Sequence, residues 1–282
     1  MHTTHKILVT GGEGQLAQAL KHVRGDNDIC IFVDKNELDI TSAEALEEFF
    51  KEHRPDVVIN TAAYTQVDAS ESYPETAFSV NDVAVKNLAG ICESYNCKLI
   101  HISTDYVFDG TAHQPYRETD PTNPVTVYGK SKRAGEEAIQ NSKLKSYAIV
   151  RTSWLYSPYG HNFYKTMLRL AHSKNELSIV NDQKGSPTNA LHLAEALLLI
   201  AHTLKPENSG LYHYCNGGQT TWFGFAKAIF EKHNLSIEVK PVTSEEYATA
   251  AQRPAYSVLD SNKIKKTFSL NIPDWQTALN TL

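Results

Sequence analysis

The chain has 282 residues, 41% of them hydrophobic and 21% charged, which is an ordinary composition for a globular protein of one or two lobes. Its net charge of −5 at pH 7 argues against electrostatic binding to nucleic acid or to an anionic membrane. The longest apolar stretch, around Leu191 to His202, is interrupted by His192 and Glu195 and is too short to span a bilayer.

Residues 1–5 lead directly into an apolar strand pattern, without the basic and apolar regions of a signal peptide. The cysteines show neither a CxxC motif nor paired spacing, which is typical of reduced thiols. They are Cys30, Cys92, Cys97 and Cys215. We therefore expect a cytoplasmic protein.

Five short apolar runs predict buried strands of a parallel sheet. They are continuously apolar rather than alternating, as expected when helices cover both faces of the sheet. The runs are Ile7–Thr10, Ile29–Val33, Val57–Asn60, Lys98–Ser103 and Tyr147–Arg151. Helical patterns between them begin at Gly14, Ser42, Pro74 and near Val125. This alternation predicts a doubly wound, Rossmann-type α/β fold.

After Arg151 the alternation is less regular, because six prolines separate shorter elements. Helical patterns there cover Phe163–Ala171, Ala190–Leu204 and Trp222–Lys232. We expect a dinucleotide-binding domain over residues 1–155 and a smaller C-terminal substrate-binding lobe over residues 156–282. Elements from residues 176–235 are expected to return to the first sheet.

A glycine-rich turn joins the first predicted strand to the first helix. Small residues recur at Gly11, Gly14 and Ala17, where dinucleotide-binding folds need a tight turn, close approach to a pyrophosphate and helix–strand packing. The spacing is GxxGxxA rather than GxGxxG, so its place between strand and helix supports the prediction. The helix N-terminus would offer free N–H groups to the phosphates. A purely structural turn is the alternative.

Asp34 ends the second strand, about 20 residues after the turn, where a carboxylate can accept both ribose hydroxyls and favour NADH. Lys35 would tolerate the 2′-phosphate of NADPH, and a loop-capping role for Asp34 stays open. Asp39 and Ile40 could face the adenine, with a helix-start role for Asp39 equally open. Small residues at 61–63 would let the backbone pass close to the cofactor.

Tyr128 and Lys132 form a YxxxK pair, one turn apart on one helix face. Carbonyl reduction needs a proton donor, and a phenol with a pKa of about 10 is a poor acid/base at neutral pH. A lysine ammonium one turn away stabilises the phenolate and can hydrogen-bond the nicotinamide ribose. The pair follows a strand ending in residues 102–108, where a hydroxyl can meet the substrate carbonyl. A surface helix pair is the alternative.

These motifs resemble the extended short-chain dehydrogenase/reductase superfamily and, within it, the dTDP-4-dehydrorhamnose reductases. The similarity extends over nearly the whole chain. Its most specific segments are Ser103–Gly110 (STDYVFDG) and Arg151–Tyr156 (RTSWLY). Ala17 stands where relatives often have glycine, which affects helix packing and leaves the chemistry unchanged.

The resemblance implies reduction of the C4 carbonyl of dTDP-4-dehydro-6-deoxy-L-mannose to dTDP-L-rhamnose, a precursor of cell-surface polysaccharide. It implies NADH or NADPH as cofactor. Together with the glycine turn, it predicts cofactor contacts by Gly11, Gly14, Gln15, Leu16, Asp34, Asp39, Ile40, Ala62, Ala63, Tyr64, Tyr128 and Lys132. A homodimer is consistent with the resemblance.

The resemblance also assigns the chemistry. Tyr128 would donate the proton, Lys132 would support it, and Thr104 would polarise the carbonyl. Substrate contacts are predicted for Thr104, Asp105, Tyr106, Trp154 and Arg253. A core position for Trp154 and a surface ion pair for Arg253 stay open.

Some relatives bind a magnesium ion between subunits, but no motif here assigns its ligands, and we expect no catalytic metal because HExxH is absent. Two other functions stay open. One is a nucleotide-sugar epimerase or dehydratase, although Tyr106 stands where a dehydratase would have a second acid. The other is a non-catalytic, dinucleotide-binding regulatory subunit of another enzyme.

Overall fold

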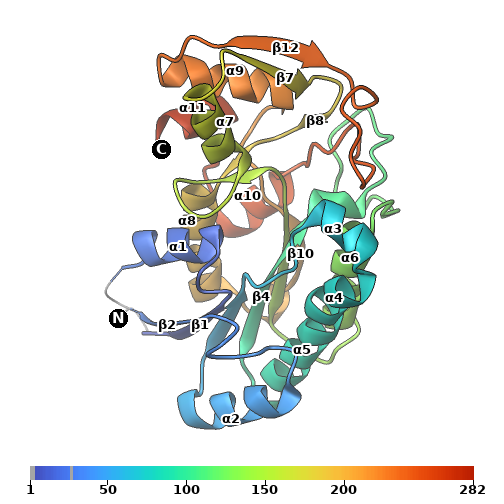
Figure 1. Cartoon of the computed structure of the whole chain (residues 1–282). Helices are drawn as coiled ribbons and strands as arrows, with labels where there is room; N and C mark the ends of the chain where they lie inside the picture. The colour runs from blue at the N-terminus through green and yellow to red at the C-terminus, as the bar shows by residue number, and fades with distance from the viewer. Residues whose placement is uncertain (1–3, 26–27) are drawn as a thin grey trace.

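The computed structural model describes residues 4–25 and 28–282. Residues 1–3, on which the signal-peptide prediction partly rests, lie outside the described residues. A six-stranded parallel sheet forms the centre of the molecule (Figure 1). Its strands are β1 Lys6–Thr10, β2 Ile29–Val33, β3 Val57–Asn60, β4 Lys98–Thr104, β5 Tyr147–Thr152 and β10 Gly210–His213. The five strands predicted from the sequence are confirmed to within one residue at each end.

The strand order is β10-β5-β4-β3-β1-β2. The chain therefore leaves β1 towards one edge to form β2 and then crosses to the other side of β1 to form β3. In open parallel sheets, ligands bind beyond the carboxyl ends of the strands at the point where the order reverses. That point lies here between β1 and β3.

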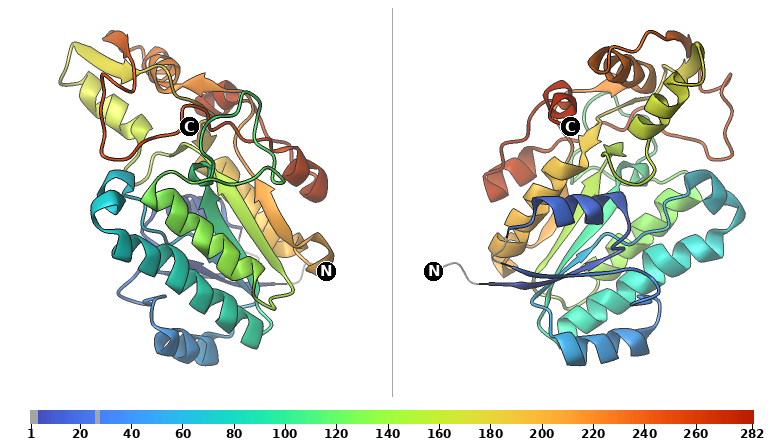
Figure 2. Two further views of the ribbon diagram at one scale, coloured as in Figure 1. Left: turned by 90° about the vertical axis from the view of Figure 1, so that its right-hand side faces the viewer. Right: turned by 60° about the vertical axis from the view of Figure 1, so that its left-hand side comes forward.

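Helices cover both faces of the sheet (Figure 2). Ile7 and Val9 of β1 pack towards one set of helices, and Leu8 between them packs towards the other. The first set is α1 Gln15–Val23, α8 Ala190–Thr203 and α10 Asn262–Phe268. The second set is α2 Ala43–His53, α5 Ala84–Ser94 and α6 Val127–Gln140. The doubly wound α/β fold is confirmed.

Side-chain caps set where two of these helices begin. The Ser42 hydroxyl accepts a hydrogen bond from the Ala45 N–H at 3.2 Å, so α2 begins where the sequence predicts. Thr126 caps α6 by accepting from the Gly129 N–H at 3.0 Å. Helix α6 therefore begins two residues after the predicted Val125.

The segment between β3 and α5 is helical almost throughout. It contains α3 Val67–Ser72, α4 Pro74–Phe78 and the π-helical turn η1 Ser79–Val83. Helix α4 begins at the predicted proline, which stands at the first helical position.

A smaller lobe lies above the sheet in Figure 1. Strands β7 Glu176–Val180 and β12 Glu238–Val242 pair in parallel, although the sequence predicts neither. Helices α7 Phe163–Ala171, α9 Trp222–Lys232 and α11 Trp275–Asn280 enclose an aromatic core with them. The lobe's core includes Tyr156 and Phe225, both without solvent exposure.

Short elements connect the sheet and the lobe. Strand β6 Leu155–Tyr156 pairs in parallel with β9 Thr188–Asn189, and β8 Lys184–Gly185 pairs antiparallel with β11 Thr220–Thr221. The 3-10 turns are η2 Asp105–Val107 and η3 Pro206–Asn208.

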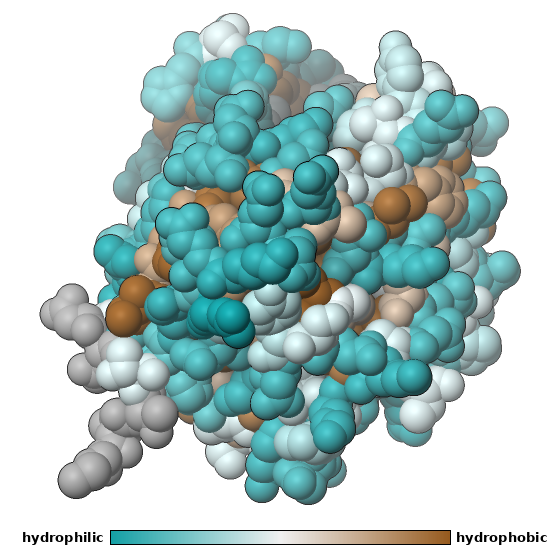
Figure 3. All heavy atoms as spheres, turned by 90° about the horizontal axis from the view of Figure 1, so that it is seen from below, coloured by the Kyte–Doolittle hydropathy of each residue, from teal (hydrophilic) through white to brown (hydrophobic). Residues whose placement is uncertain are grey.

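No helix in the described part of the chain is long and apolar enough to cross a membrane. The face shown in Figure 3 is mostly hydrophilic, with apolar residues in small separate groups. Large exposed apolar side chains come from different elements, among them Ile29 of β2 and Leu199 of α8. Single exposed apolar residues of this kind are ordinary on a folded protein.

Candidate active site

The glycine-rich turn lies between the ends of β1 and β3. Gly11 has a φ of +70°, and a Cβ at this position would lie 2.8 Å from the Ala62 backbone, so only glycine fits. Gly14 is the N-cap of α1 and provides no side-chain cap to that helix. The first N–H groups of α1 are therefore available to a ligand. This cradle fits the pyrophosphate of a dinucleotide.

Gln15 and Leu16 open α1 with their side chains engaged elsewhere. Gln15 Oε1 accepts hydrogen bonds from Ser157 Oγ at 3.2 Å and Asn162 Nδ2 at 3.1 Å. The Leu16 side chain is buried against the sheet. Both residues can therefore contribute their backbone N–H groups to a phosphate.

The acids predicted to bind ribose and adenine also organise turns. Asp34 Oδ1 accepts from the N–H groups of Asn36 at 2.7 Å and Glu37 at 3.1 Å. Asp39 Oδ1 accepts from the Thr41 hydroxyl at 2.7 Å, which lowers the pKa of Asp39. Both acids thus make local turn contacts, which correspond to the structural roles that the sequence analysis left open for them. The Ile40 side chain is buried in the core, which leaves its backbone for a cofactor.

Asn81 holds the segment that follows β3. Its amide accepts from the Tyr64 N–H at 2.9 Å and donates to the Tyr64 carbonyl at 3.0 Å. The same amide nitrogen donates to Ser131 Oγ on α6 at 3.0 Å. Nothing in the sequence predicts Asn81, because its partners lie 17 and 50 positions away. It connects the Ala62, Ala63 and Tyr64 segment to the helix that carries Tyr128.

Tyr128 stands in the first turn of α6, beside the end of β4. A Cβ at Gly129 would collide with the carbonyl oxygen of Tyr106, so glycine permits this close approach. The Tyr106 and Tyr128 rings meet edge to face, with centroids 5.6 Å apart. Burial raises the pKa of Tyr128 to about 12, while the nearby Thr104 hydroxyl opposes the rise. The structure therefore brings Tyr128 and Thr104 together, with the phenol protonated at neutral pH.

Lys132 is buried, with 1% of its surface exposed. Its Nζ atom donates to the Ile102 carbonyl at 2.7 Å and lies 3.4 Å from His101 Nε2. Burial lowers the pKa of Lys132 to about 8, against the opposing effect of the Glu136 carboxylate. The sequence predicts that Lys132 lowers the pKa of Tyr128. In the structure the Lys132 side chain extends to the backbone of β4, and burial is the largest cause of the raised pKa of Tyr128; the effect of Lys132 on the phenolate stays a prediction.

Asp105 follows Thr104 and is buried beneath it. Asp105 Oδ1 accepts from the Thr104 hydroxyl at 3.0 Å, and Oδ2 has no hydrogen-bond partner among the described residues. Burial raises the pKa of Asp105 to about 6. A buried acceptor without a partner suits a hydroxyl-bearing ligand. Burial also raises the pKa of the neighbouring Tyr106.

Trp154 is half-buried and stacks on Trp222, with ring centroids 3.6 Å apart. Gly185 lies against the Trp154 indole, where a Cβ would collide with the ring. Trp222 also lines a cavity of about 690 Å³ between α3 and the lobe, within the range typical of small-molecule sites. Trp154 thus supports one wall of this cavity.

Arg253 lies at the edge of the same cavity. Its guanidinium donates to both carboxylate oxygens of Asp68, at 3.2 Å and 2.6 Å. This is the ion pair that the sequence left open, and it holds the pKa of Asp68 below its usual value. Arg253 also interacts with Tyr106, whose ring contacts Tyr128. The cavity edge and the tyrosine–lysine pair are therefore neighbours.

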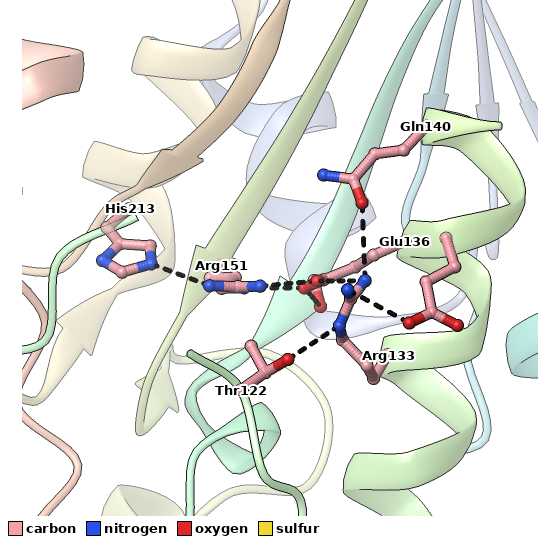
Figure 4. Close-up of polar contacts among 8 residues, drawn as sticks. Thr122, Arg133, Glu136, Gln140, Arg151 and His213 are labelled. Atoms are coloured by element: carbon pink, nitrogen blue, oxygen red, sulfur yellow. Dashed lines mark hydrogen bonds and ion pairs between the residues drawn. The ribbon is translucent and has the colours of Figure 1, made fainter. Parts of the chain in front are cut away.

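A buried ion pair fixes α6 against the sheet (Figure 4). Glu136 accepts from Arg151 Nε at 2.8 Å and from Nη2 at 2.7 Å. The Ser103 hydroxyl, one residue before Thr104, donates to the same carboxylate at 2.6 Å. Glu136 therefore joins the helix that carries Tyr128 to both β4 and β5. The sequence does not predict this role for Glu136.

The described residues contain no group of three or more His, Cys, Asp or Glu side chains placed to hold a metal ion. All four cysteines are free.

Comparison with known proteins identifies relatives over nearly the full length of the chain. A family model described as the RmlD substrate binding domain matches residues 5–282. A dTDP-4-dehydrorhamnose reductase of Sinorhizobium fredii is 38% identical, covering 98% of this chain and 96% of the relative. The spore coat polysaccharide biosynthesis protein SpsK of Bacillus subtilis is 41% identical, covering 97% of this chain and 95% of the relative.

A solved structure shows the same arrangement. The crystal structure of dTDP-4-dehydrorhamnose reductase from Bacillus anthracis, in complex with NADP, has a TM-score of 0.95 at 38% identity. The match covers 99% of this chain and 98% of that one. The resemblance inferred from the motifs is confirmed, and the chain belongs to the dTDP-4-dehydrorhamnose reductase family.

Proposed function

We propose that this protein reduces the C4 carbonyl of dTDP-4-dehydrorhamnose to a hydroxyl, giving dTDP-L-rhamnose, with NADH or NADPH as the reductant. The observation that carries the proposal is the placement of the Tyr128 phenol, in the first turn of α6, beside Tyr106 and the Thr104 hydroxyl at the end of β4. The family membership supports it, because the Bacillus anthracis relative was crystallised with NADP. A cytoplasmic location and a homodimer stay predictions, and no residue is assigned to a magnesium ion.

The cofactor would lie across the carboxyl ends of β1 and β3. Gly11 and Gly14 would admit the pyrophosphate to the N-terminus of α1, where the N–H groups of Gln15 and Leu16 bind it. The free Oδ2 of Asp34 would accept the ribose hydroxyls. The remaining contacts would come from Asp39, Ile40, Ala62, Ala63, Tyr64 and Lys132.

The nicotinamide, when bound, supplies a hydride to C4 of the sugar. The Thr104 hydroxyl would turn from Asp105 and donate its hydrogen bond to the C4 oxygen as negative charge develops there. Tyr128 would give its phenolic proton to the same oxygen. The Lys132 ammonium would stabilise the phenolate that remains, which matters because burial alone disfavours this anion.

The nucleotide half of the substrate would occupy the 690 Å³ cavity beside Trp222. Trp222 stacks on Trp154, and together they form a rigid aromatic wall. Arg253 would bind the diphosphate by exchanging its contact with Asp68 for phosphate oxygens. The unpartnered Oδ2 of Asp105 would accept a hydrogen bond from a sugar hydroxyl.

Stoichiometry tests the proposed function. We expect purified protein to oxidise one NADH or NADPH for each dTDP-4-dehydrorhamnose consumed, measured by nicotinamide absorbance and by product analysis. The free deoxysugar should react poorly, because binding of the nucleotide positions the ring. Cofactor binding without turnover would favour the regulatory subunit. Product formation without net cofactor oxidation would favour an epimerase.

Variants of Asp34 test the cofactor preference. We expect Asp34→Asn to lower the ratio of the NADPH to the NADH dissociation constant, because the change removes a negative charge beside the 2′-position. Asn keeps an oxygen that can accept from Asn36, so the turn survives. Asp34→Ala should shift the preference similarly and also lower the melting temperature. If the wild-type protein strongly preferred NADPH, Lys35 rather than Asp34 would determine the cofactor preference, and the assignment of Asp34 would be wrong.

A further inference from the structure

Asp105 is a buried acid beside the hydroxyl of Thr104. The residue is 2% exposed, and its Oδ1 atom accepts from the Thr104 hydroxyl at 3.0 Å. Its Oδ2 atom has no hydrogen-bond partner among the described residues. Burial raises the pKa of Asp105 to about 6, so the free protein holds this side chain mainly as a carboxylate at pH 7. The hydrogen bond from Thr104 stabilises that carboxylate.

The Thr104 hydroxyl has one proton and two acceptor lone pairs. In the free protein it donates the proton to Asp105, and it accepts from the Tyr106 N–H at 3.2 Å. A bound ketosugar brings a carbonyl oxygen, which can only accept, to the same hydroxyl. Thr104 cannot donate to both acceptors. Its donation to the C4 oxygen therefore leaves Oδ1 of Asp105 without the hydroxyl donor.

The neutral form of Asp105 resolves this conflict. A buried carboxylate that loses a donor is destabilised relative to the neutral acid, because hydrogen bonds to the charged form offset its burial. The O–H of the neutral acid would donate to the second lone pair of Thr104, and the other oxygen would still accept from a sugar hydroxyl. The neutral acid also keeps a fixed negative charge away from the C4 oxygen, where negative charge develops during the reduction.

We propose that Asp105 takes up one proton from the solvent when the ketosugar binds, and that the resulting acid donates a hydrogen bond to Thr104 and directs the Thr104 proton to the C4 oxygen. Asp105 is in this respect a positioning residue, because it acts on the carbonyl through Thr104. A hydroxyl that accepts a hydrogen bond becomes a better donor, since hydrogen bonds in a chain polarise one another. This inference rests on the proposed function.

The titratable side chains that face Asp105 in the described part of the chain keep their protons at neutral pH. They are Tyr106 in η2, Tyr128 on α6 and Cys215 after β10. Burial raises the pKa of all three. The Ser257 hydroxyl also faces Asp105, and it can donate to the charged form or accept from the neutral form. Beyond Tyr106 lies the Arg253 guanidinium, which is paired with Asp68.

Calorimetry of binding tests the proton uptake without turnover. Protein saturated with oxidised cofactor can bind dTDP-4-dehydrorhamnose but cannot reduce it, because no hydride is available. Titrations at pH 7 in buffers with different heats of ionisation give the number of protons taken up per ketosugar. We expect nearly one proton, because only about a tenth of Asp105 is already neutral at this pH. The matched ligand is dTDP-L-rhamnose. Its C4 hydroxyl can donate to Thr104, which leaves Asp105 its donor, so far fewer protons should be taken up.

The variant Asp105→Asn separates protonation from the shape of the side chain. Its amide can donate to Thr104 at every pH, so the ketosugar should bind to it without proton uptake. In the wild type, kcat/KM should fall about tenfold per pH unit above the pKa of Asp105, because the free protein must first gain the proton. The ratio of the variant's kcat/KM to that of the wild type should therefore rise about tenfold between about pH 7 and pH 8. The ratio cancels the effects of other groups that both proteins share.

Asp82→Asn provides a matched control. Asp82 lies in η1, and burial raises its pKa too, but it interacts with Lys86 and Glu137 rather than with Thr104. The ratio of its kcat/KM to that of the wild type should stay constant with pH. The same constant ratio in Asp105→Asn would overturn the proposal, and so would equal proton uptake with the ketosugar and with dTDP-L-rhamnose.

The outcomes distinguish this inference from the proposed function. If Asp105→Asn does not fold, the comparison of the two sugars on the wild-type protein still decides. Turnover of the ketosugar without proton uptake on binding would overturn the role of Asp105 and leave the proposed reduction in place. A protein that binds neither sugar would overturn both.

Discussion

Replacing Tyr128 with phenylalanine is expected to lower kcat by roughly 10²–10⁴. The change removes one hydroxyl, the proton donor beside Thr104, and keeps the ring that packs against Tyr106. The glycine turn and the α1 N-terminus do not involve this hydroxyl, so the dissociation constant for NADH should stay within a few-fold. Steady-state kinetics and cofactor titration measure the two quantities.

Tyr156 offers a matched control for this substitution. Its hydroxyl is buried in the lobe and has no hydrogen-bond partner among the described residues. Tyr156→Phe therefore removes the same atom from a site without proposed chemistry, and turnover should be unchanged. The assignment of Tyr128 would be wrong if Tyr128→Phe kept more than roughly a tenth of wild-type turnover.

The sequence predicts the parts of the site that short segments encode. The turn can be recognised because the positive φ of Gly11 and its contact with the Ala62 backbone restrict that position to glycine. The spacing of Tyr128 and Lys132 is visible because a single helix fixes it. The central strands are visible because burial on both faces makes them continuously apolar. These features need no knowledge of which segments meet in the fold.

The polar contacts that connect those segments are not visible in the sequence. His101 stands within an apolar run, and its contact with Asn60 joins positions 41 apart. Arg253 and Asp68 are 185 positions apart, so the sequence could propose an ion pair without naming the partner. The sequence analysis also did not predict strands β7 and β12. They form an outer two-stranded pair with several exposed residues, which lacks the apolar pattern of the central strands.

The second large expected effect is a loss of folding stability when the buried Glu136–Arg151 ion pair is broken. Glu136→Gln should lower the free energy of unfolding by about 3–5 kcal/mol, because it leaves the Arg151 guanidinium buried without its counter-charge. Arg151 is 2% exposed and Glu136 is fully buried, so water cannot replace the lost partner. Urea unfolding, followed by tryptophan fluorescence and by circular dichroism, measures the change.

A variant of Arg133 provides a comparison between this buried ion pair and a partly exposed one (Figure 4). Arg133 also approaches Glu136, at 3.7 Å, but its side chain is 25% exposed and its closer carboxylate is Glu137 at 3.1 Å. Arg133→Gln should therefore cost less than about 1 kcal/mol. If Glu136→Gln lowered the free energy of unfolding by as little as Arg133→Gln, the buried pair would not be what holds α6 against the sheet.

A double variant separates the cost of an unpaired charge from the loss of the contact itself. Glu136→Met combined with Arg151→Met removes both charges and fills the space with flexible apolar side chains. Because desolvating an ion pair offsets much of its attraction, the double variant should be more stable than Glu136→Gln alone. It should nevertheless turn over more slowly than wild type. The carboxylate that holds Ser103, beside Thr104, and that favours the charged form of Lys132 is then absent.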